Sequence, residues 1–235
     1  MSKYKWILVI TFITVWIWAA IRPKYPHDWL LENILVFVFV PVIFLMSRYF
    51  KLSNLSYTLL TLFFIFHLIG SHYTYAEVPF GYMLQKFFKA DRNMYDRLIH
   101  FSFGFLVAYP IREFLMRIVK VKGFWSYYLP FDVTLSFSGV YEIVEWLAAI
   151  NVNEAAGIAF LGAQGDIWDA QKDMLMAAIG ALLAMSIIAI INLKYNNKFV
   201  EDIKESLKPS YNDEILGEVK LKKMIERGNN KNESI

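Results

Sequence analysis

Residues 127–150 read YYLPFDVTLSFSGVYEIVEWLAAI, an apolar stretch whose second half carries two carboxylates, Glu142 and Glu145. A bilayer core requires about 20 mainly apolar helical residues, so the stretch predicts a transmembrane helix. The three-residue spacing places both carboxylates on one face of that helix. Burying a carboxylate beside hydrocarbon is expensive, and such groups usually face the protein interior and mark a functional site. The stretch therefore predicts a membrane fold and the position of its functional residues.

The composition of the whole chain also indicates a membrane protein. Of its 235 residues, 57% are hydrophobic and 17% aromatic, and the mean hydropathy is positive. Blocks of spanning length cover residues 4–21, 30–47, 55–71, 98–119, 127–150 and 171–193. We therefore expect an all-α fold, a polytopic bundle of about six transmembrane helices over residues 1–196. A polar cytoplasmic tail over 197–235 should follow, with a short surface helix at 213–227.

Several kinds of chemistry are excluded by what the chain lacks. It has no cysteine, which excludes disulfides, zinc–thiolate sites and thiol nucleophiles. No Walker loop, G-x-S-x-G, H-E-x-x-H or glycine-rich dinucleotide motif occurs. The net charge of +3 is small and needs no nucleic-acid partner. The first apolar block is bulky and no small-residue cleavage site follows it, so we expect a retained span rather than a signal peptide.

The loop charges predict the orientation of the bundle. Lysine and arginine are frequent at the amino terminus and in the loops on its side, whereas residues 151–171 contain neither. Because cytoplasmic loops carry an excess of these residues, both termini are expected in the cytoplasm. The connection over 72–97 opposes this bias, because it contains lysines and arginines but would lie on the extracytoplasmic side. Residues 82–89 within it predict an interfacial amphipathic helix.

This topology brings polar residues from four helix ends to one extracytoplasmic depth. They are His67 and His72 on the third span, Asp96, Arg97 and His100 on the fourth, Glu142 and Glu145 on the fifth, and Asp166, Asp169 and Asp173 on the sixth. Burying such groups separately would cost several kcal/mol each. We therefore expect the centre of the cluster to lie within about 10 Å of His100, Glu142, Glu145, Asp169 and Asp173, with Asp96 at its rim.

The spacing of these residues predicts their roles. We expect His100, Glu142 and Glu145 to be catalytic, because Asp96, one turn before His100, can orient the imidazole for proton transfer or metal binding. The alternative is that Asp96 caps a helix while Arg97 reaches toward lipid headgroups. The residues expected to bind substrate are Asp96, Arg97, His72 and Glu77. His67 is interpreted as a packing residue, and Arg112 and Glu113 as a structural or snorkelling pair.

A divalent metal is the expected cofactor. Glu142 and Glu145 cannot both stay ionised in a low dielectric without a cation, an arginine or a shared proton. Oxygen ligands with a histidine suit Mg²⁺, Mn²⁺ or Zn²⁺, and the predicted ligands are Asp169, Asp173, Glu142 and Glu145. In the alternatives, Arg97 enters the cluster while some carboxyls stay protonated, or Glu142 and Glu145 form a structural pair with Arg97 or Arg112. Asp166 and Asp169 also suit a helix cap and first turn.

Four stretches carry a resemblance to known proteins: GSHYTYAEVPFG (70–81), YDRLIHFSFG (95–104), SGVYEIVEW (138–146) and LGAQGDIWDAQKDM (161–174). Together they closely resemble the YjdF-like bacterial inner-membrane proteins, a family without an established function. A looser pattern of charged residues is similar to VanZ-like membrane proteins. It comprises Asp96, Arg97 and His100, then Glu142 and Glu145, then Asp169 and Asp173. Those proteins are linked with glycopeptide-antibiotic tolerance at the cell envelope, but typically carry Gln where Glu145 stands. The resemblance implies a bacterial plasma (inner) membrane location and no reaction.

Three functions fit these residues. The first is a metal-assisted enzyme at the outer leaflet that acts on a lipid or lipid-linked envelope substrate. The second is a non-catalytic envelope-binding or assembly protein with a structural polar cluster. The third is a small proton-coupled transporter, which the short chain, the lack of an internal repeat and the one-ended cluster disfavour. Membrane lipid is the expected partner, and the sequence does not determine the oligomeric state.

Overall fold

The computed structural model describes residues 2–151, 157, 163–209 and 221–226, and within them it is all-α. Six helices are long and apolar enough to cross a membrane: α1 (Lys3–Ala20), α2 (Pro26–Tyr49), α3 (Asn54–Tyr73), α5 (Tyr95–Phe114) with its π-helical continuation Leu115–Val119, α6 (Trp125–Ile150) and α8 (Asp169–Tyr195). The expected six-helix bundle is therefore confirmed. The helices extend two to four residues beyond several predicted blocks, because polar residues such as Asp96 and Asp169 belong to their first turns.

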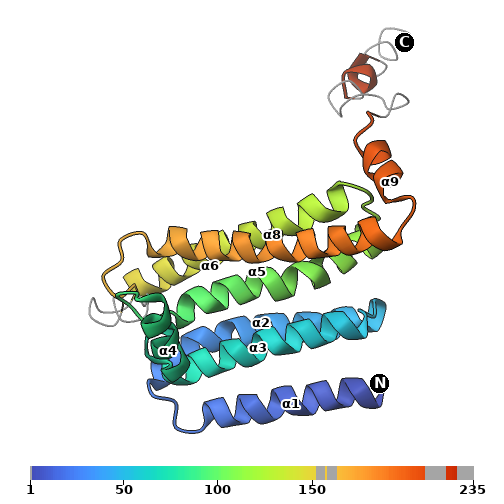
Figure 1. Cartoon of the computed structure of the whole chain (residues 1–235). Helices are drawn as coiled ribbons and strands as arrows, with labels where there is room; N and C mark the ends of the chain where they lie inside the picture. The colour runs from blue at the N-terminus through green and yellow to red at the C-terminus, as the bar shows by residue number, and fades with distance from the viewer. Residues whose placement is uncertain (1, 152–156, 158–162, 210–220, 227–235) are drawn as a thin grey trace, which may run out of the picture.

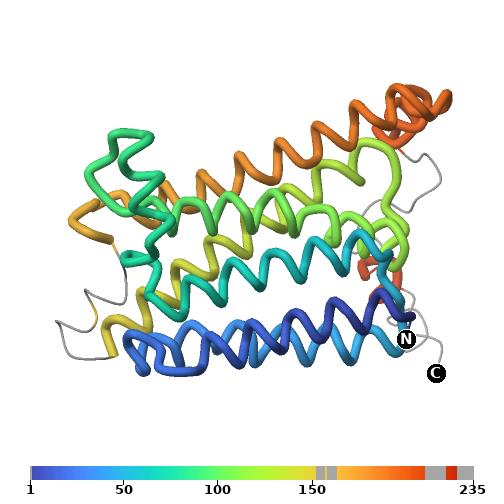
Figure 2. Tube along the Cα trace, turned by 60° about the horizontal axis from the view of Figure 1, so that its bottom comes forward, coloured from blue at the N-terminus to red at the C-terminus, as the bar shows by residue number. Residues whose placement is uncertain are grey.

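The helices lie side by side, and α5 is central (Figure 1). It packs against α3 on one side and against α6 and α8 on the other, while α1 lies on the outer side of α3. The amino terminus and the carboxyl end of α8 lie at one end of the bundle, and the short helix α4 (Pro79–Phe88) lies at the other (Figure 2). We call this other end the α4 end.

Small residues allow α5 and α8 to approach closely. A Cβ atom on Gly104 would collide with the carbonyl oxygen of Ala177, and one on Gly180 with that of Phe101. Ala177 and Ala181 are fully buried in the same contact. Close backbone approach through small residues is how helices associate in membranes, where the hydrophobic effect does not favour helix contact.

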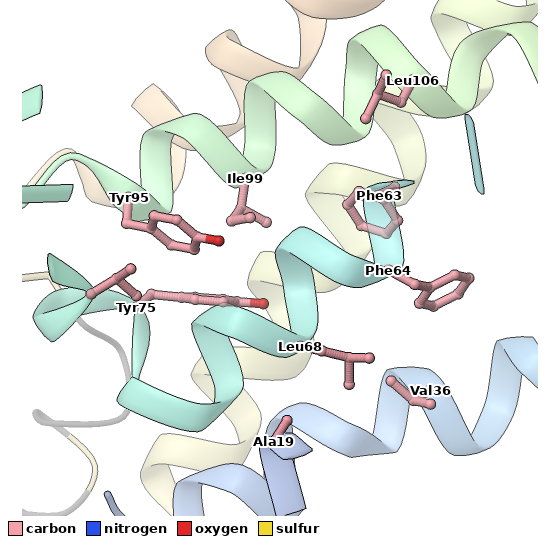
Figure 3. Close-up of a cluster of buried hydrophobic side chains, with 10 residues drawn as sticks. Ala19, Val36, Phe63, Phe64, Leu68, Tyr75, Tyr95, Ile99 and Leu106 are labelled. Carbon is pink, nitrogen blue, oxygen red and sulfur yellow. The ribbon is translucent and has the colours of Figure 1, made fainter. Parts of the chain in front are cut away.

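A hydrophobic core fills the space between α1, α2, α3 and α5 (Figure 3). Leu68 of α3 packs there against Ala19 and Val36, with Phe63, Phe64, Ile99 and Leu106 continuing the core along α3 and α5. By contrast, Ala19 is the one residue of α1 that is buried, and Trp6, Ile10 and Ile17 are exposed. An apolar helix with so little buried surface suits contact with lipid.

The connections contain a short helix close to the one predicted at 82–89. Residues 82–89 fall almost entirely within α4, which exposes Met83, Phe87 and Phe88. After α8, the short helix α9 (Phe199–Ser206) returns to α6, where Ser206 Oγ accepts a hydrogen bond of 2.9 Å from the Phe124 amide. Residues 221–226 are helical and exposed, while the rest of the surface helix expected at 213–227 lies outside the described residues.

Candidate functional site

Two buried arginines hold the acidic residues together at the α4 end. Arg97 of α5 forms ion pairs with Asp173, with Asp169 at 2.6 Å and with Asp166 at 3.2 Å. Arg92, in the segment before α5, pairs with Asp169 and lies 3.2 Å from Asp96. The alternative in which Arg97 reaches toward lipid headgroups is therefore wrong, because its side chain is only 6% exposed and faces the bundle interior.

The arginines orient two aspartates in the same way. Asp96 presents Oδ2 to Arg92 and Oδ1 to His100, whose Nε2 lies 3.7 Å away. Asp173 presents Oδ2 to Arg97, and its Oδ1 is buried without a hydrogen-bond partner. Asp96, His100 and Asp173 each offer a ligand atom within 4.8 Å of the others, and all three residues are buried. Asp96 was expected at the rim, but its pairing with Arg92 places it inside the cluster.

Glu142 completes the surroundings of His100. Its Oε1 lies 3.4 Å from His100 Nε2, yet this oxygen is buried and accepts no hydrogen bond. On the other side of the ring, His100 Nδ1 lies 3.4 Å from Ser138 Oγ. Nε2 thus faces two carboxylates, while Nδ1 faces a hydroxyl.

A second polar group continues the cluster toward α2 and α3. Tyr141 donates a hydrogen bond of 2.9 Å to Glu32 Oε2, and the Tyr141 ring lies edge-on to His100 with centroids 6.1 Å apart. Glu145, one turn beyond Glu142 on α6, is also buried. Glu32 was missed from the sequence, although an acidic residue inside an apolar block is the same signal that identified Glu142.

His67 has the packing role expected for it. Its Nε2 donates to the Glu32 carbonyl oxygen at 3.1 Å, and the Tyr75 hydroxyl donates to Nδ1 at 2.5 Å. Burial, reinforced by the charge of Glu32, raises the pKa of the Tyr75 hydroxyl well above its usual value. Tyr75 therefore keeps its proton and can act as the donor.

Asn93 fixes the segment that carries Arg92. Its side chain donates to the Val78 carbonyl oxygen at 3.0 Å and accepts from the Tyr95 amide at 3.0 Å. Its own amide donates at 2.9 Å to the side chain of Gln164, in the loop before α8. Sequence reasoning missed Arg92, Asn93 and Gln164, because nothing local distinguishes them from ordinary loop residues.

Other predicted residues lie apart from this cluster. The His72 ring stacks on Trp18 and its Nδ1 lies 3.1 Å from the Ala19 carbonyl oxygen. Glu77 pairs with Lys24 and accepts a hydrogen bond of 3.1 Å from the Tyr25 hydroxyl. The His72 side chain therefore contacts the end of α1, and Glu77 contacts the segment between α1 and α2.

The predicted pair of Arg112 and Glu113 is not formed. Glu113 instead accepts hydrogen bonds from the Ser53 amide at 2.8 Å and the Ser56 hydroxyl at 2.5 Å, and pairs with Arg117 at 2.6 Å. Arg112 donates to Ser126 Oγ at 3.3 Å. Consecutive residues on a helix point in different directions, which separates the two side chains. Among the described ion pairs, none joins Glu142 or Glu145 to Arg97 or Arg112.

Asp166 lies at the solvent side of the cluster. It accepts a hydrogen bond of 3.1 Å from the Trp168 amide and pairs with Lys172 at 2.7 Å. The expectation that Asp166 caps the helix is wrong, because α8 begins at Asp169 and its N-cap residue is Trp168. The Lys172 hydrogen bond, followed by that of the Trp168 amide, lowers the pKa of the Asp166 carboxyl. Asp166 is therefore ionised at neutral pH.

The buried charges do not balance among the described side chains. Arg92 and Arg97 are enclosed with six carboxyl groups: Glu32, Asp96, Glu142, Glu145, Asp169 and Asp173. Two guanidinium groups neutralise only part of this charge. Buried like charges strongly disfavour joint ionisation, so the remaining carboxyls require protons or a further cation.

A groove between α6 and α8 reaches this cluster from the side of the bundle. Its volume is about 500 Å³, and its lining includes Gly139, Val140, Ile143 and Trp146 of α6 and Met174 of α8. Glu142 is the one ionisable residue in the lining. The groove therefore extends from the apolar face of the bundle to Glu142, at the edge of the polar centre.

The fold and this site define a polytopic helical membrane protein whose ionisable residues meet at one end of the bundle. The chain belongs to the family described as "Predicted membrane protein (DUF2238)", which matches residues 4–194. It is 36% identical over 191 residues to the inner membrane protein YjdF of Escherichia coli (strain K12), covering 81% of this chain and 91% of that protein. No solved structure matches the chain. The resemblance to YjdF-like membrane proteins is thus confirmed.

Proposed function

We propose that this chain is a metal-assisted enzyme whose polar centre acts on a lipid or lipid-linked envelope substrate. The observation that carries the proposal is the shared orientation of Asp96 and Asp173. Each gives Oδ2 to an arginine, which leaves Oδ1 of Asp96 facing His100 and Oδ1 of Asp173 buried without a partner. Groups that orient metal ligands from outside are a regular feature of metal sites. We therefore assign Asp96, His100 and Asp173 as the ligands of a divalent cation.

The surroundings of His100 support this assignment. Nδ1 faces the Ser138 hydroxyl, and if it carries the proton, the lone pair of Nε2 faces Asp96 and Glu142. A lone pair beside two carboxylates is repulsive unless a positive charge lies between them. A metal ion supplies that charge and also uses the unpartnered Oδ1 of Asp173.

The donor set narrows the choice of metal. One imidazole with two carboxylates suits Zn²⁺ or Mn²⁺ better than Mg²⁺, which prefers oxygen ligands and retains several waters. Three protein ligands leave a position for water or substrate. A metal there would polarise a substrate oxygen or activate water. Glu142, with its free Oε1 beside His100, would accept the proton as general base, while Glu145 and Asp169 would act from outside the ligand set.

We propose the extracytoplasmic side for this centre and the cytoplasm for both termini, which the bias of the loop charges favours. The alternative function is a non-catalytic envelope-binding or assembly protein. It is favoured by the pairing of Arg92 and Arg97 with four aspartates, which can stabilise the bundle without a metal. Metal content separates the two functions.

The test is elemental analysis of the full chain purified in detergent after exposure to Mn²⁺ and Zn²⁺ and desalting. We expect about one metal ion per chain, lost in Asp173→Asn and His100→Gln. Asp132→Asn is the matched control, because Asp132 is exposed on α6 and its substitution also removes one carboxylate. Absence of bound metal from the wild-type protein would overturn the proposed enzyme and leave the binding protein.

A further inference from the structure

The groove between α6 and α8 opens toward the surrounding bilayer. Val140, Ile143 and Trp146 line it, and each is 55% exposed on the outer surface of the bundle. These residues belong to a candidate membrane span, so the surface around the opening is apolar and of the kind that contacts lipid. A ligand can therefore reach the groove laterally, without leaving the membrane.

The inner wall of the groove, unlike its opening, carries an ionisable side chain. Glu142 lies there, with its side chain 11% exposed and its Oε1 directed at His100. One ligand must therefore satisfy an apolar opening and a polar end. A volume of about 500 Å³ falls in the usual range for small-molecule sites, about 300–1,000 Å³.

Gly139 keeps the groove open. A Cβ atom at this position would lie 3.3 Å from Met174 Sδ across the groove, so any larger side chain would occupy the space between α6 and α8. Gly139 is thus unlike Gly104 and Gly180, whose missing side chains allow helix contact. Here the missing side chain leaves room for a ligand.

We infer that this groove binds the acyl chain of a membrane phospholipid and presents its headgroup to Glu142 and His100. This inference rests on the proposed function and deepens it, because it assigns the substrate to the amphiphiles of the surrounding leaflet. The apolar opening matches an acyl chain, and Glu142 in the lining matches a headgroup that carries an ammonium group, such as that of phosphatidylethanolamine. The groove lining on α6 spans residues 136–146, about 15 Å of helix, which is half the length that a partner transmembrane helix would cover.

The test uses the full chain in nanodiscs of phosphatidylethanolamine and phosphatidylglycerol with a trace of phosphatidylethanolamine that carries a diazirine in its acyl chain. After irradiation, mass spectrometry maps the crosslinks. We expect them to concentrate on the groove lining, residues 139, 140, 142, 143, 146, 170, 171 and 174, and to decrease as unlabelled phosphatidylethanolamine is added. Gly139→Leu, which fills the groove from α6, should reduce this labelling at least fivefold, and Met174→Phe, which fills it from α8, should do the same.

Val144→Phe is the matched control. It adds as many heavy atoms as Gly139→Leu, on an exposed position of the same helix outside the groove lining, and should leave the labelling unchanged. Labelling spread evenly over the apolar surface, or unaffected by both filling variants, would overturn the inference, as would a crosslink that seats a second copy of the chain in the groove. Metal content measured on the same samples is independent: metal bound without groove labelling refutes the acyl-chain site alone, and groove labelling without metal refutes the enzyme alone.

Discussion

Replacing Arg97 by methionine should strongly destabilise the bundle, because the Arg97 guanidinium neutralises buried carboxylates. Three aspartates contact it, but they depend on it unequally. Asp166 retains Lys172 and is partly exposed, and Asp169 retains Arg92. Asp173 has no other ion pair among the described residues and is only 3% exposed at its side chain. In the metal-free protein, the substitution therefore leaves one uncompensated buried charge rather than three.

Leaving one partner of a buried ion pair uncompensated typically costs about 3–5 kcal/mol, and we expect Arg97→Met to lower the free energy of unfolding by that amount. Adding Asp173→Asn removes the stranded charge, so the double variant should recover most of the loss. Unfolding by sodium dodecyl sulfate in mixed micelles, followed by tryptophan fluorescence, measures these differences.

Arg117→Met serves as the control. Arg117 pairs with Glu113 at the opposite end of the bundle, where its side chain is 52% exposed, so its loss should cost at most about 1 kcal/mol. If Arg97→Met unfolds like the wild type, or if Asp173→Asn makes it less stable still, the assignment of Arg97 as the counter-charge of Asp173 is wrong.

Three further predictions concern packing, pH and topology. Gly180→Leu should lower the free energy of unfolding by about 1–3 kcal/mol or more in the same assay, because the leucine side chain would collide with the Phe101 carbonyl oxygen. Stability equal to that of the wild type would contradict the close packing of α5 and α8. Folding lowers the pKa of the Asp166 carboxyl, so its contribution to the stability of the folded state is present above the pKa of the unfolded chain, 3.8, and is lost as pH falls below that value. The stability difference between wild type and Asp166→Asn, measured by thermal unfolding, should therefore shrink in acid, and a difference that grows would refute this. Reporter fusions after Asn151 and after Asn197 should report opposite sides of the membrane, whereas identical readouts would mean a miscounted span.

The sequence was sufficient to predict the helices because the requirement of the bilayer is local. A run such as 127–150 must form a helix to satisfy its backbone in lipid, and the structure has α6 over Trp125–Ile150. The presence of His100, Glu142 and Asp173 at one end follows from counting spans. Periodicity and length thus determine which residues share a depth.

The pairing partners could not be predicted in the same way. Arg92 and Asp169 are 77 residues apart, and their contact depends on how the segment before α5 folds against the start of α8. The sequence therefore does not distinguish Arg92 from other charged loop residues. Glu77 was expected near the cluster, but the chain turns at Thr74, where φ is 59°, and Glu77 pairs with Lys24 instead. Such turns depend on tertiary contacts that the local pattern does not contain.

The most direct test of the central claim is the pulsed electron paramagnetic resonance spectrum of the protein loaded with Mn²⁺. If Asp96, His100 and Asp173 hold the ion, the electron spin echo should be modulated by a directly coordinated imidazole nitrogen, and His100→Gln should abolish that modulation. A spectrum with oxygen ligands alone, or a nitrogen modulation that persists in His100→Gln, would contradict a metal centre built on His100.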